Sequence, residues 1–121
     1  MNKTTRQTVD HKGRIKIPSQ FRKSGQDATF VLTRGRENGL YIFPLGEWAE
    51  IEKRLHALPV TQPQTRHFLR ILTTQATRLA VDQQGRITIP RVLLDLAQIQ
   101  TDVLIVDTHE DYLELRSPDS R

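Results

Sequence analysis

Three cationic side chains occupy alternate positions in a short string near the start of the chain: Lys12, Arg14 and Lys16. Ammonium and guanidinium groups contact phosphate, and an arginine can also bond the O6 and N7 acceptors of a guanine. Arg14 could instead pair with the nearby Asp10, whereas Lys12 has few structural duties. These residue types predict a nucleic-acid contact, with Lys12 on phosphate, Arg14 on a base and Lys16 beside it.

The residues around these cations predict a tight turn followed by a half-buried strand. Gly13 can adopt a positive φ, and the carboxylate of Asp10 can accept bonds from the backbone amides that follow it. Because a carboxylate repels phosphate, we expect Asp10 to hold the turn and not to touch a nucleic acid. Ile15 and Ile17 alternate with the cations, so the cations should face solvent. Pro18 then ends the strand.

The same string occurs a second time, 72 residues further along the chain. Residues 9–18 and 81–90 are identical at seven of ten positions. The chain is therefore predicted to contain two homologous halves, residues 1–45 and 73–118, around an insert of residues 46–72. A half of this size buries too little surface for a core of its own. We expect the halves to exchange strands and form one intertwined β-barrel.

Each half should continue with a short helix and two short strands. A helix is expected at 92–97 and, less clearly, at 19–23. The offset of 72 aligns residues 31–32 with 103–104. The expected strands are 29–33 and 40–43 in the first half, and 103–106 and 112–115 in the second.

The insert has the periodicity of helices. Trp48, Ile51, Leu55 and Leu58 form an apolar stripe at helical spacing. Prolines 59 and 63 interrupt the pattern, and a second helix is expected at about 63–75. The fold class predicted is therefore mainly β with α, with a helical hairpin between two β halves, and Trp48 is expected in the core or at a contact between subunits.

The positive charge is concentrated at the front of the chain. The net charge is only +4, yet the first 36 residues hold nine Lys or Arg and two Asp. A basic front on a slightly acidic body suits a surface that binds phosphates. No apolar run approaches the roughly 20 residues of a membrane span, and no apolar stretch behind Met1 indicates a signal peptide. We expect a cytoplasmic protein without a membrane partner.

The sequence offers little for other kinds of chemistry. The absence of cysteine excludes disulfides and thiolate chemistry. His11, His56, His67 and His109 lack the spacing of metal ligands, and no glycine-rich loop of the nucleotide-binding type is present. Ser19, Ser24 and Ser117 lack a base-like pattern nearby. We therefore expect no enzyme activity, no metal, no cofactor and no small-molecule substrate.

Three further cations are candidates for nucleic-acid contact. Lys3 and Arg6 could form a flexible arm near the first loop. Arg86 repeats Arg14, but Gln84 and Thr88 replace the two lysines of the first string. We therefore expect the first loop to dominate binding and Arg86 to be mainly structural.

The string of residues 10–18 resembles the signature of MraZ proteins, a branch of the AbrB/SpoVT swapped-hairpin superfamily. Residues 82–86 resemble the looser second motif, and residues 40–48 resemble the family's junction between strand and helix. The residues directly after Met1 depart from the aromatic and glycine that often stand there in the family. The resemblance covers nearly the whole chain.

This resemblance implies a swapped-hairpin β-barrel made by both halves of one chain. It also implies a transcriptional regulator, usually a repressor, that binds short tandem G-rich repeats in the promoter of the division and cell-wall gene cluster. Such proteins bind double-stranded DNA, associate with the nucleoid and form rings of about eight to twelve subunits. Two alternatives are a protein-interaction scaffold that does not bind DNA and an antitoxin-like module of the same fold. Antitoxins typically have one half and a disordered tail, unlike this chain.

Overall fold

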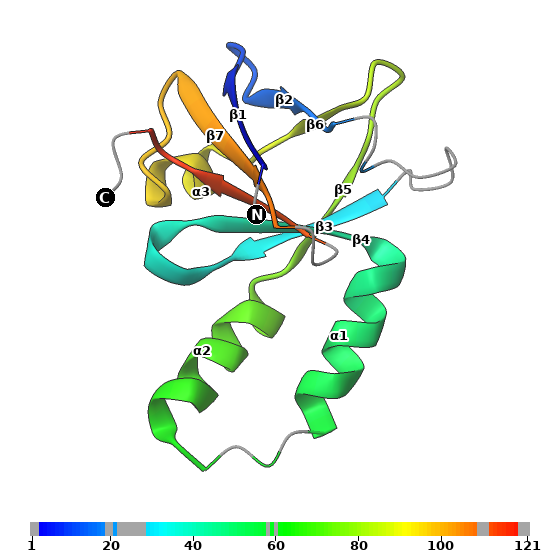
Figure 1. Cartoon of the computed structure of the whole chain (residues 1–121), viewed down its shortest axis with the longest axis vertical. Coiled ribbons are helices and arrows are strands. Elements are labelled where there is room, and N and C mark those ends of the chain that lie inside the picture. The colour runs from blue at the N-terminus through cyan, green and yellow to red at the C-terminus, as the bar shows by residue number, and fades with distance from the viewer. Residues whose placement is uncertain are drawn as a thin grey trace.

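Among the residues that the structure describes, the fold combines a large antiparallel sheet, a short two-stranded ribbon and three helices (Figure 1). The computed structural model describes residues 3–18, 21, 29–57, 59, 61–108 and 112–118. The strands are β1 (Lys3–Thr8), β2 (Arg14–Lys16), β3 (Thr29–Arg34), β4 (Leu40–Pro44), β5 (Thr77–Ala80), β6 (Arg86–Thr88), β7 (Asp102–Asp107) and β8 (Leu113–Arg116). The helices are α1 (Leu45–Ala57), α2 (Pro63–Thr74) and α3 (Arg91–Leu96), and a 3-10 turn, η3 (Arg36–Asn38), joins β3 to β4. This is the mainly β fold that the repeated string predicts.

The two halves of the sequence exchange strands throughout the structure. The six-stranded sheet has the order β1-β7-β8-β4-β3-β5, and β2 pairs with β6 in the β2–β6 ribbon. Among the described strands, each one pairs with a strand of the other half: β1 with β7, β3 with β5, β4 with β8, and β2 with β6. The strands are therefore intertwined, as expected for halves too small to bury a core alone.

The main core lies between the sheet and the β2–β6 ribbon. Ile15 and Ile17 point into it from β2, and Ile87 and Ile89 point into it from the second string. Further buried side chains come from the large sheet and α3: Phe30, Leu32, Leu40, Ile42, Leu94, Val103, Ile105, Leu113 and Leu115. The alternation in the two strings therefore has the predicted result, with isoleucines inside and polar residues outside.

The helical insert packs on the other face of the sheet. Trp48 of α1 and Leu72 of α2 contact Val31 and Phe43 of the sheet in a second, smaller cluster. Thr33, which is fully buried, donates a hydrogen bond from its hydroxyl to the carbonyl of Leu72 at 2.8 Å. Figure 1 shows α1 and α2 at one end of the molecule and the β2–β6 ribbon at the other. The insert thus lies far from the ribbon.

The offset between the halves is not constant, which corrects the expected alignment of residues 31–32 with 103–104. In the ribbon, Ile15 pairs with its repeat equivalent Ile87, an offset of 72. In the later hairpins, Leu32 pairs with Ile42 and Ile105 pairs with Leu115, an offset of 73. A slip of one residue would turn every core side chain of a strand outward. The second half therefore has one residue more between β6 and β7, in the segment that contains α3, than the first half has between β2 and β3.

Most of the expected elements lie within one or two residues of their observed bounds. The second insert helix ends at Thr74, and the strand expected at 112–115 is β8. The helix expected at 19–23 lies outside the described residues except for Phe21, and Leu58 of the apolar stripe also lies outside them. The flexible arm expected to carry Lys3 and Arg6 was wrong, because both residues belong to β1, which pairs with β7 over six residues.

Candidate nucleic-acid interface

Asp10 organises the turn between β1 and β2. Its Oδ1 accepts hydrogen bonds from the backbone amides of Lys12, at 2.9 Å, and Arg14, at 2.8 Å. Gly13 has a φ of +80°, and its amide donates to the Asp10 carbonyl at 2.9 Å. A side chain other than hydrogen is unfavourable in this conformation. The sequence therefore predicted both the conformation of the turn and the residue that holds it.

The second turn has the same construction. Asp82 Oδ1 accepts from the amides of Gln84, at 2.8 Å, and Arg86, at 2.9 Å. Gly85 has a φ of +79° and donates from its amide to the carbonyl of Asp82. Two turns of one geometry thus stand at the ends of the β2–β6 ribbon.

Each turn also fixes an arginine by an ion pair. Arg14 Nε lies 2.6 Å from Asp10 Oδ2, and Arg86 Nε lies 3.0 Å from Asp82 Oδ2. The side chains remain similarly exposed, 23% for Arg14 and 28% for Arg86. Because the bond uses only Nε, the four N–H donors on the terminal nitrogens of each guanidinium are not taken by this pair. The two ion pairs thus orient the arginines without using the N–H donors on their terminal nitrogens.

These bonds keep both carboxyl groups ionised. The backbone amide of Arg14, helped by its guanidinium and the amide of Lys12, lowers the pKa of Asp10 to about 2. The backbone amide of Arg86 is the main cause that lowers the pKa of Asp82. Hydrogen bonds to a carboxylate favour its charged form. Both turns are therefore held by carboxylates at neutral pH.

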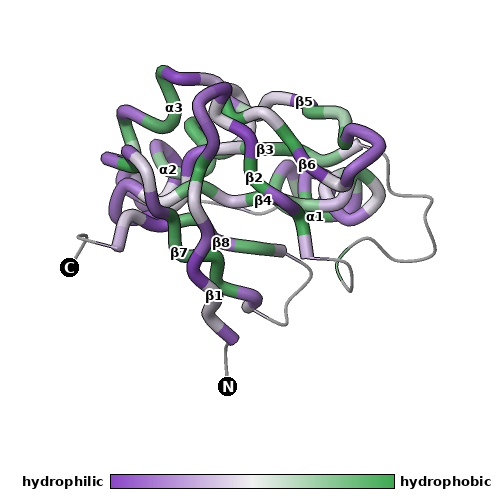
Figure 2. Tube along the Cα trace, turned by 90° about the horizontal axis from the view of Figure 1, so that it is seen from above, coloured by the Kyte–Doolittle hydropathy of each residue, from purple (hydrophilic) through white to green (hydrophobic). Residues whose placement is uncertain are grey.

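The register of the ribbon brings cations from both halves onto one face. Lys16 stands directly opposite Arg86, and Arg14 stands opposite Thr88. These four side chains alternate with the buried isoleucines, so they lie on the outer face of the ribbon. In Figure 2, hydrophilic and hydrophobic residues alternate along β2 and β6. The structure therefore places Arg86 beside the cations of the first string.

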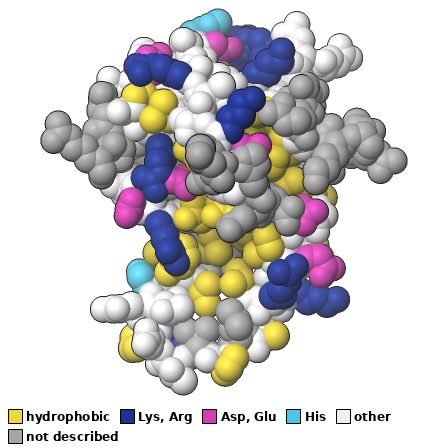
Figure 3. Space-filling model, in the orientation of Figure 1, with side chains coloured by type: hydrophobic (Ala, Val, Ile, Leu, Met, Phe, Trp, Pro, Cys, Tyr) yellow, Lys and Arg dark blue, Asp and Glu magenta, His cyan; other side chains and the backbone are white. Residues whose placement is uncertain are grey.

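The tip of the first turn adds charge at the end of this face. Lys12 and its neighbour His11 are exposed there. Figure 3 shows Lys or Arg side chains and a histidine gathered at the upper end of the molecule, where Figure 1 draws the turn between β1 and β2. We define the cationic face as Lys12, Arg14, Lys16 and Arg86.

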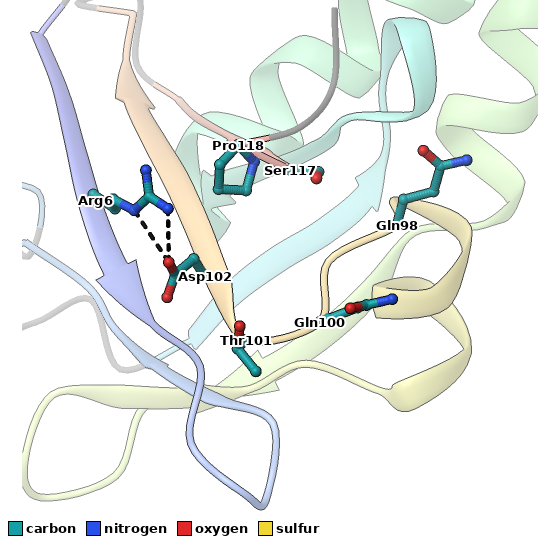
Figure 4. Close-up of a pocket in the computed structure, with 7 residues that line it drawn as sticks. All are labelled: Arg6, Gln98, Gln100, Thr101, Asp102, Ser117 and Pro118. Atoms are coloured by element: carbon teal, nitrogen blue, oxygen red, sulfur yellow. Dashed lines mark hydrogen bonds and ion pairs between the residues drawn. The ribbon is translucent and has the colours of Figure 1, made fainter.

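Lys3 and Arg6 do not join the cationic face. Arg6 pairs with Asp102 of β7, with 2.7 Å between Nη2 and Oδ2. This pair lines a polar hollow of about 80 Å³, shown in Figure 4 with Ser117 and Pro118. The hollow is much smaller than the several hundred Å³ typical of a ligand site. Lys3 is the first residue of β1 and stands four residues before Gln7, whose side chain bonds to Lys16 of the ribbon. At about 3.3 Å per residue, these four residues separate Lys3 from the ribbon.

One contact of the cationic face was missed by the sequence analysis. The side-chain amide of Gln7 donates to the Lys16 carbonyl at 2.8 Å, and its Oε1 accepts from the Lys16 amide at 3.0 Å. The repeat contained a signal for it, since Leu79 stands 72 residues after Gln7. A polar residue in one half against an apolar residue in the other indicates a contact that only one half makes.

Metal-ligand clusters and membrane-spanning helices can be assessed for the part of the chain that the structure describes. Within those residues there is no group of three His, Asp or Glu side chains that could hold a metal ion, and His109 lies outside them. None of the described helices combines the length and the apolar character needed to cross a membrane.

Comparison with known proteins agrees with the two strings. The family model of the MraZ protein matches the chain twice, at residues 1–71 and 72–120. The chain belongs to the MraZ family. The description of that model also likens the MraZ protein to antitoxins.

Several MraZ proteins are similar over most of this chain. The transcriptional regulator MraZ of Halothermothrix orenii is 43% identical over 98 residues, which cover 81% of this chain and 68% of that protein. The one of Desulfitobacterium hafniense is 40% identical over 99 residues, 82% of this chain and 68% of its own length. The transcriptional regulator MraZ of Natranaerobius thermophilus is 40% identical over 101 residues, which cover 84% of this chain and 70% of that protein. These MraZ relatives are named as transcriptional regulators.

Proposed function

We propose that this MraZ-family protein is a transcriptional regulator that binds double-stranded DNA through the cationic face. The observation that carries the proposal is the register of the β2–β6 ribbon, which sets Lys16 opposite Arg86 and Arg14 opposite Thr88. Strands from both halves thus build one binding surface.

The shape of this surface suits the major groove. The groove admits a two-stranded β-ribbon, and the outward side chains of such a ribbon reach the edges of the bases. Arg14 is held at Nε by Asp10, so its terminal nitrogens are oriented for a bidentate contact to guanine. Lys12 and Lys16 supply phosphate contacts. A contact of this kind fits a G-rich target.

The electrostatics of the face also favour an anionic partner. Lys16 and Arg86 form a non-hydrogen-bonded pair of the ribbon, in which the Cα atoms lie about 4.5 Å apart. Like charges directly opposite each other destabilise a sheet. The ion pair with Asp82 offsets part of the charge of Arg86, and a phosphate between Lys16 and Arg86 would relieve the remaining repulsion, whereas an apolar partner would not.

The family membership supports a finer proposal. We infer that the protein binds tandem G-rich repeats in the promoter of the division and cell-wall gene cluster as a repressor, in the cytoplasm at the nucleoid, and assembles into a ring. Tandem repeats would engage the cationic faces of several subunits at once. The affinity of the assembly would then exceed that of one subunit by a large factor.

Fluorescence anisotropy with salt titration tests DNA binding. The probes are the tightest duplex that the wild-type protein selects from a random library and a scrambled duplex of equal length. Lys12→Ala should weaken binding to both duplexes alike and lower the salt slope by about one unit. Arg14→Ala should weaken the selected duplex more, by about 1–3 kcal/mol. Because Arg86 stands opposite Lys16, we now propose that it contacts DNA as well, in place of the mainly structural role expected from the sequence, and Arg86→Ala should also lower the slope.

Arg6→Ala is the charge-matched control, because Arg6 pairs with Asp102 away from the cationic face. It should leave affinity for both duplexes unchanged. Loss of binding in a folded Arg6→Ala protein, with the cationic-face variants unaffected, would place the interface elsewhere. A wild-type protein that binds neither duplex at low salt would instead favour the scaffold alternative.

Light scattering coupled to size-exclusion chromatography tests assembly. The insert helices keep apolar residues only partly covered, including Ile51, Leu55 and Leu69. Figure 3 shows hydrophobic side chains at the surface in the region of these helices. Burial of this surface between subunits would stabilise an oligomer. We expect a species larger than a dimer, and a strict monomer at micromolar concentration would contradict the ring.

A further inference from the structure

The backbone of Lys16 has polar groups on the side of β2 that β6 does not cover. Along the ribbon, the Ile17 amide donates to the carbonyl of Gly85 and the Ile89 amide to that of Gly13, both at 2.9 Å. In an antiparallel pair, the backbone groups of alternate residues point away from the partner strand. The amide and carbonyl of Lys16 therefore point to the other edge of β2.

Gln7 fills that edge with its side chain. A carboxamide has one carbonyl acceptor and N–H donors, as a peptide group has. Its two bonds to the backbone of Lys16 reproduce the pair of bonds that a neighbouring strand residue would make. Gln7 itself lies in β1 opposite Val103 of β7. In addition to the core packing of Ile15 and Ile17, the side chain of Gln7 thus links β2 to the large sheet by hydrogen bonds.

The second half lacks this anchor. Leu79 occupies the equivalent position of β5 and packs against the main core. A leucine side chain can neither donate nor accept a hydrogen bond, so it cannot hold the backbone of Thr88 in the same way. The anchor therefore belongs to the half that supplies three of the four residues of the cationic face.

We propose that Gln7 is a positioning residue for sequence-specific DNA recognition, an inference that rests on the proposed function. Through the backbone of Lys16, Gln7 fixes β2 against the sheet and so sets the spacing of Lys16 and Arg14 from the rest of the molecule. Specific contacts need this spacing because base edges occupy fixed positions, whereas non-specific attraction needs only the charges. Loss of the anchor should therefore reduce discrimination between DNA sequences more than it reduces attraction to DNA.

The test compares Gln7→Leu with the wild-type full-length chain. Leucine is the residue that the fold already uses at the equivalent position, and Gln7→Met provides a second, unbranched variant. Thr5→Val is the matched control, since Thr5 lies two residues away in β1 and is exposed. Two readouts are the amide hydrogen exchange of Lys16 and the affinities for the selected and scrambled duplexes. Thermal unfolding checks that each variant is folded.

For Gln7→Leu we expect faster exchange of the Lys16 amide and a fall of about five- to tenfold in the ratio of specific to non-specific affinity. The salt slope should stay unchanged, because the number of cations is the same. Thr5→Val should match the wild type in both readouts.

The proposal is overturned if folded Gln7→Leu and Gln7→Met keep the wild-type ratio, or if they lose affinity equally on both duplexes. It is also overturned if neither variant folds, since Gln7 would then serve the stability of the whole chain. Failure of the proposed function gives a different result, because the wild-type protein itself would then show no salt-dependent binding to either duplex.

Discussion

At the scale of single residues, a carboxylate and an arginine form one unit in each turn. Asp10 holds two backbone amides with one oxygen and the Arg14 guanidinium with the other. The negative charge that repels phosphate is therefore engaged with the turn and its arginine. This explains how an aspartate can stand beside a face that we propose binds DNA.

The ionisation of Asp10 gives a prediction on pH. Its pKa in the folded protein lies near 2, below the ordinary value of 3.8. A lowered pKa means that the contribution of Asp10 to stability is fully present above pH 3.8 and is lost as the pH falls through about 2. An NMR titration of the side-chain carboxyl should give a midpoint near 2. A midpoint at 3.8 in the folded protein would show that the bonds to Arg14 and Lys12 do not persist in solution.

Gly13 gives a prediction on stability. A Cβ at this residue would lie 2.9 Å from the carbonyl oxygen of Ile89, and the backbone has a positive φ. Gly13→Ala should therefore lower the free energy of unfolding by more than about 1 kcal/mol, measured by urea denaturation. Gly46→Ala is the control, since nothing lies within 4 Å of a Cβ there. In a helix this change should be neutral or stabilising by up to about 1 kcal/mol. Equal effects of the two changes would contradict the turn geometry.

The residues of the turns could be predicted because their types are restricted. An aspartate, a glycine with positive φ and alternating isoleucines are required by local geometry, and that geometry is written in ten consecutive residues. The neighbours across the ribbon could not be predicted in this way. The string alone does not state that Lys16 faces Arg86 or that Gln7 reaches Lys16, because these contacts depend on the pairing of strands distant in sequence.

At the scale of elements, the same division holds between local and non-local information. The strands that were predicted and the insert helices follow from periodicity, and their bounds differ from the prediction by one or two residues, whereas β1 and β5 were not predicted as strands. The offset of 73 in the later hairpins was missed. Leu104 aligns with Leu32 by residue type, yet the pairing of Ile105 with Leu115 selects Ile105 for the core. Residue type does not show which of two neighbouring aliphatic residues is buried in the core, whereas the register of the sheet does.

The insert gives a prediction at this scale. Leu72 is buried against Val31, Phe43 and Trp48. Leu72→Ala should lower the free energy of unfolding by about 2–5 kcal/mol, because it removes buried methyl groups and leaves a cavity. The affinity of the folded protein for DNA should stay within about twofold, since distant sites act independently. Urea denaturation and anisotropy at a temperature where the variant is folded measure both. Loss of DNA affinity in the folded variant would mean that the insert supports the cationic face.

At the scale of the whole molecule, the exchange of strands builds both the core and the cationic face. Neither half forms the cationic face alone, because β2 contributes Arg14 and Lys16 and β6 contributes Arg86. The Ile15–Ile87 pair lies at the centre of the ribbon, where a strand from one half meets its own repeat equivalent. The repeat in the sequence therefore gives the β2–β6 ribbon and its cationic face an approximate twofold symmetry. A repeat in a short chain predicts this symmetry, although the chemistry of the two halves differs at Lys12 and Lys16.

The last prediction concerns folding of the two halves, which we expect to be one cooperative event. Fragment 1–72 contains β1, β2, β3 and β4, and fragment 73–121 contains β5, β6, β7 and β8. Each of these described strands pairs with a strand of the other fragment, so each fragment alone lacks these partners. Each fragment alone would leave core isoleucines exposed and sheet edges unpaired, and should give the narrow NMR dispersion of an unfolded chain. Mixing the two fragments should restore the dispersed spectrum and the DNA affinity, because the missing pairings then form between chains. A stable monomeric fragment 1–72 with a dispersed spectrum would mean that the halves fold independently and that the exchange of strands is not needed for the core.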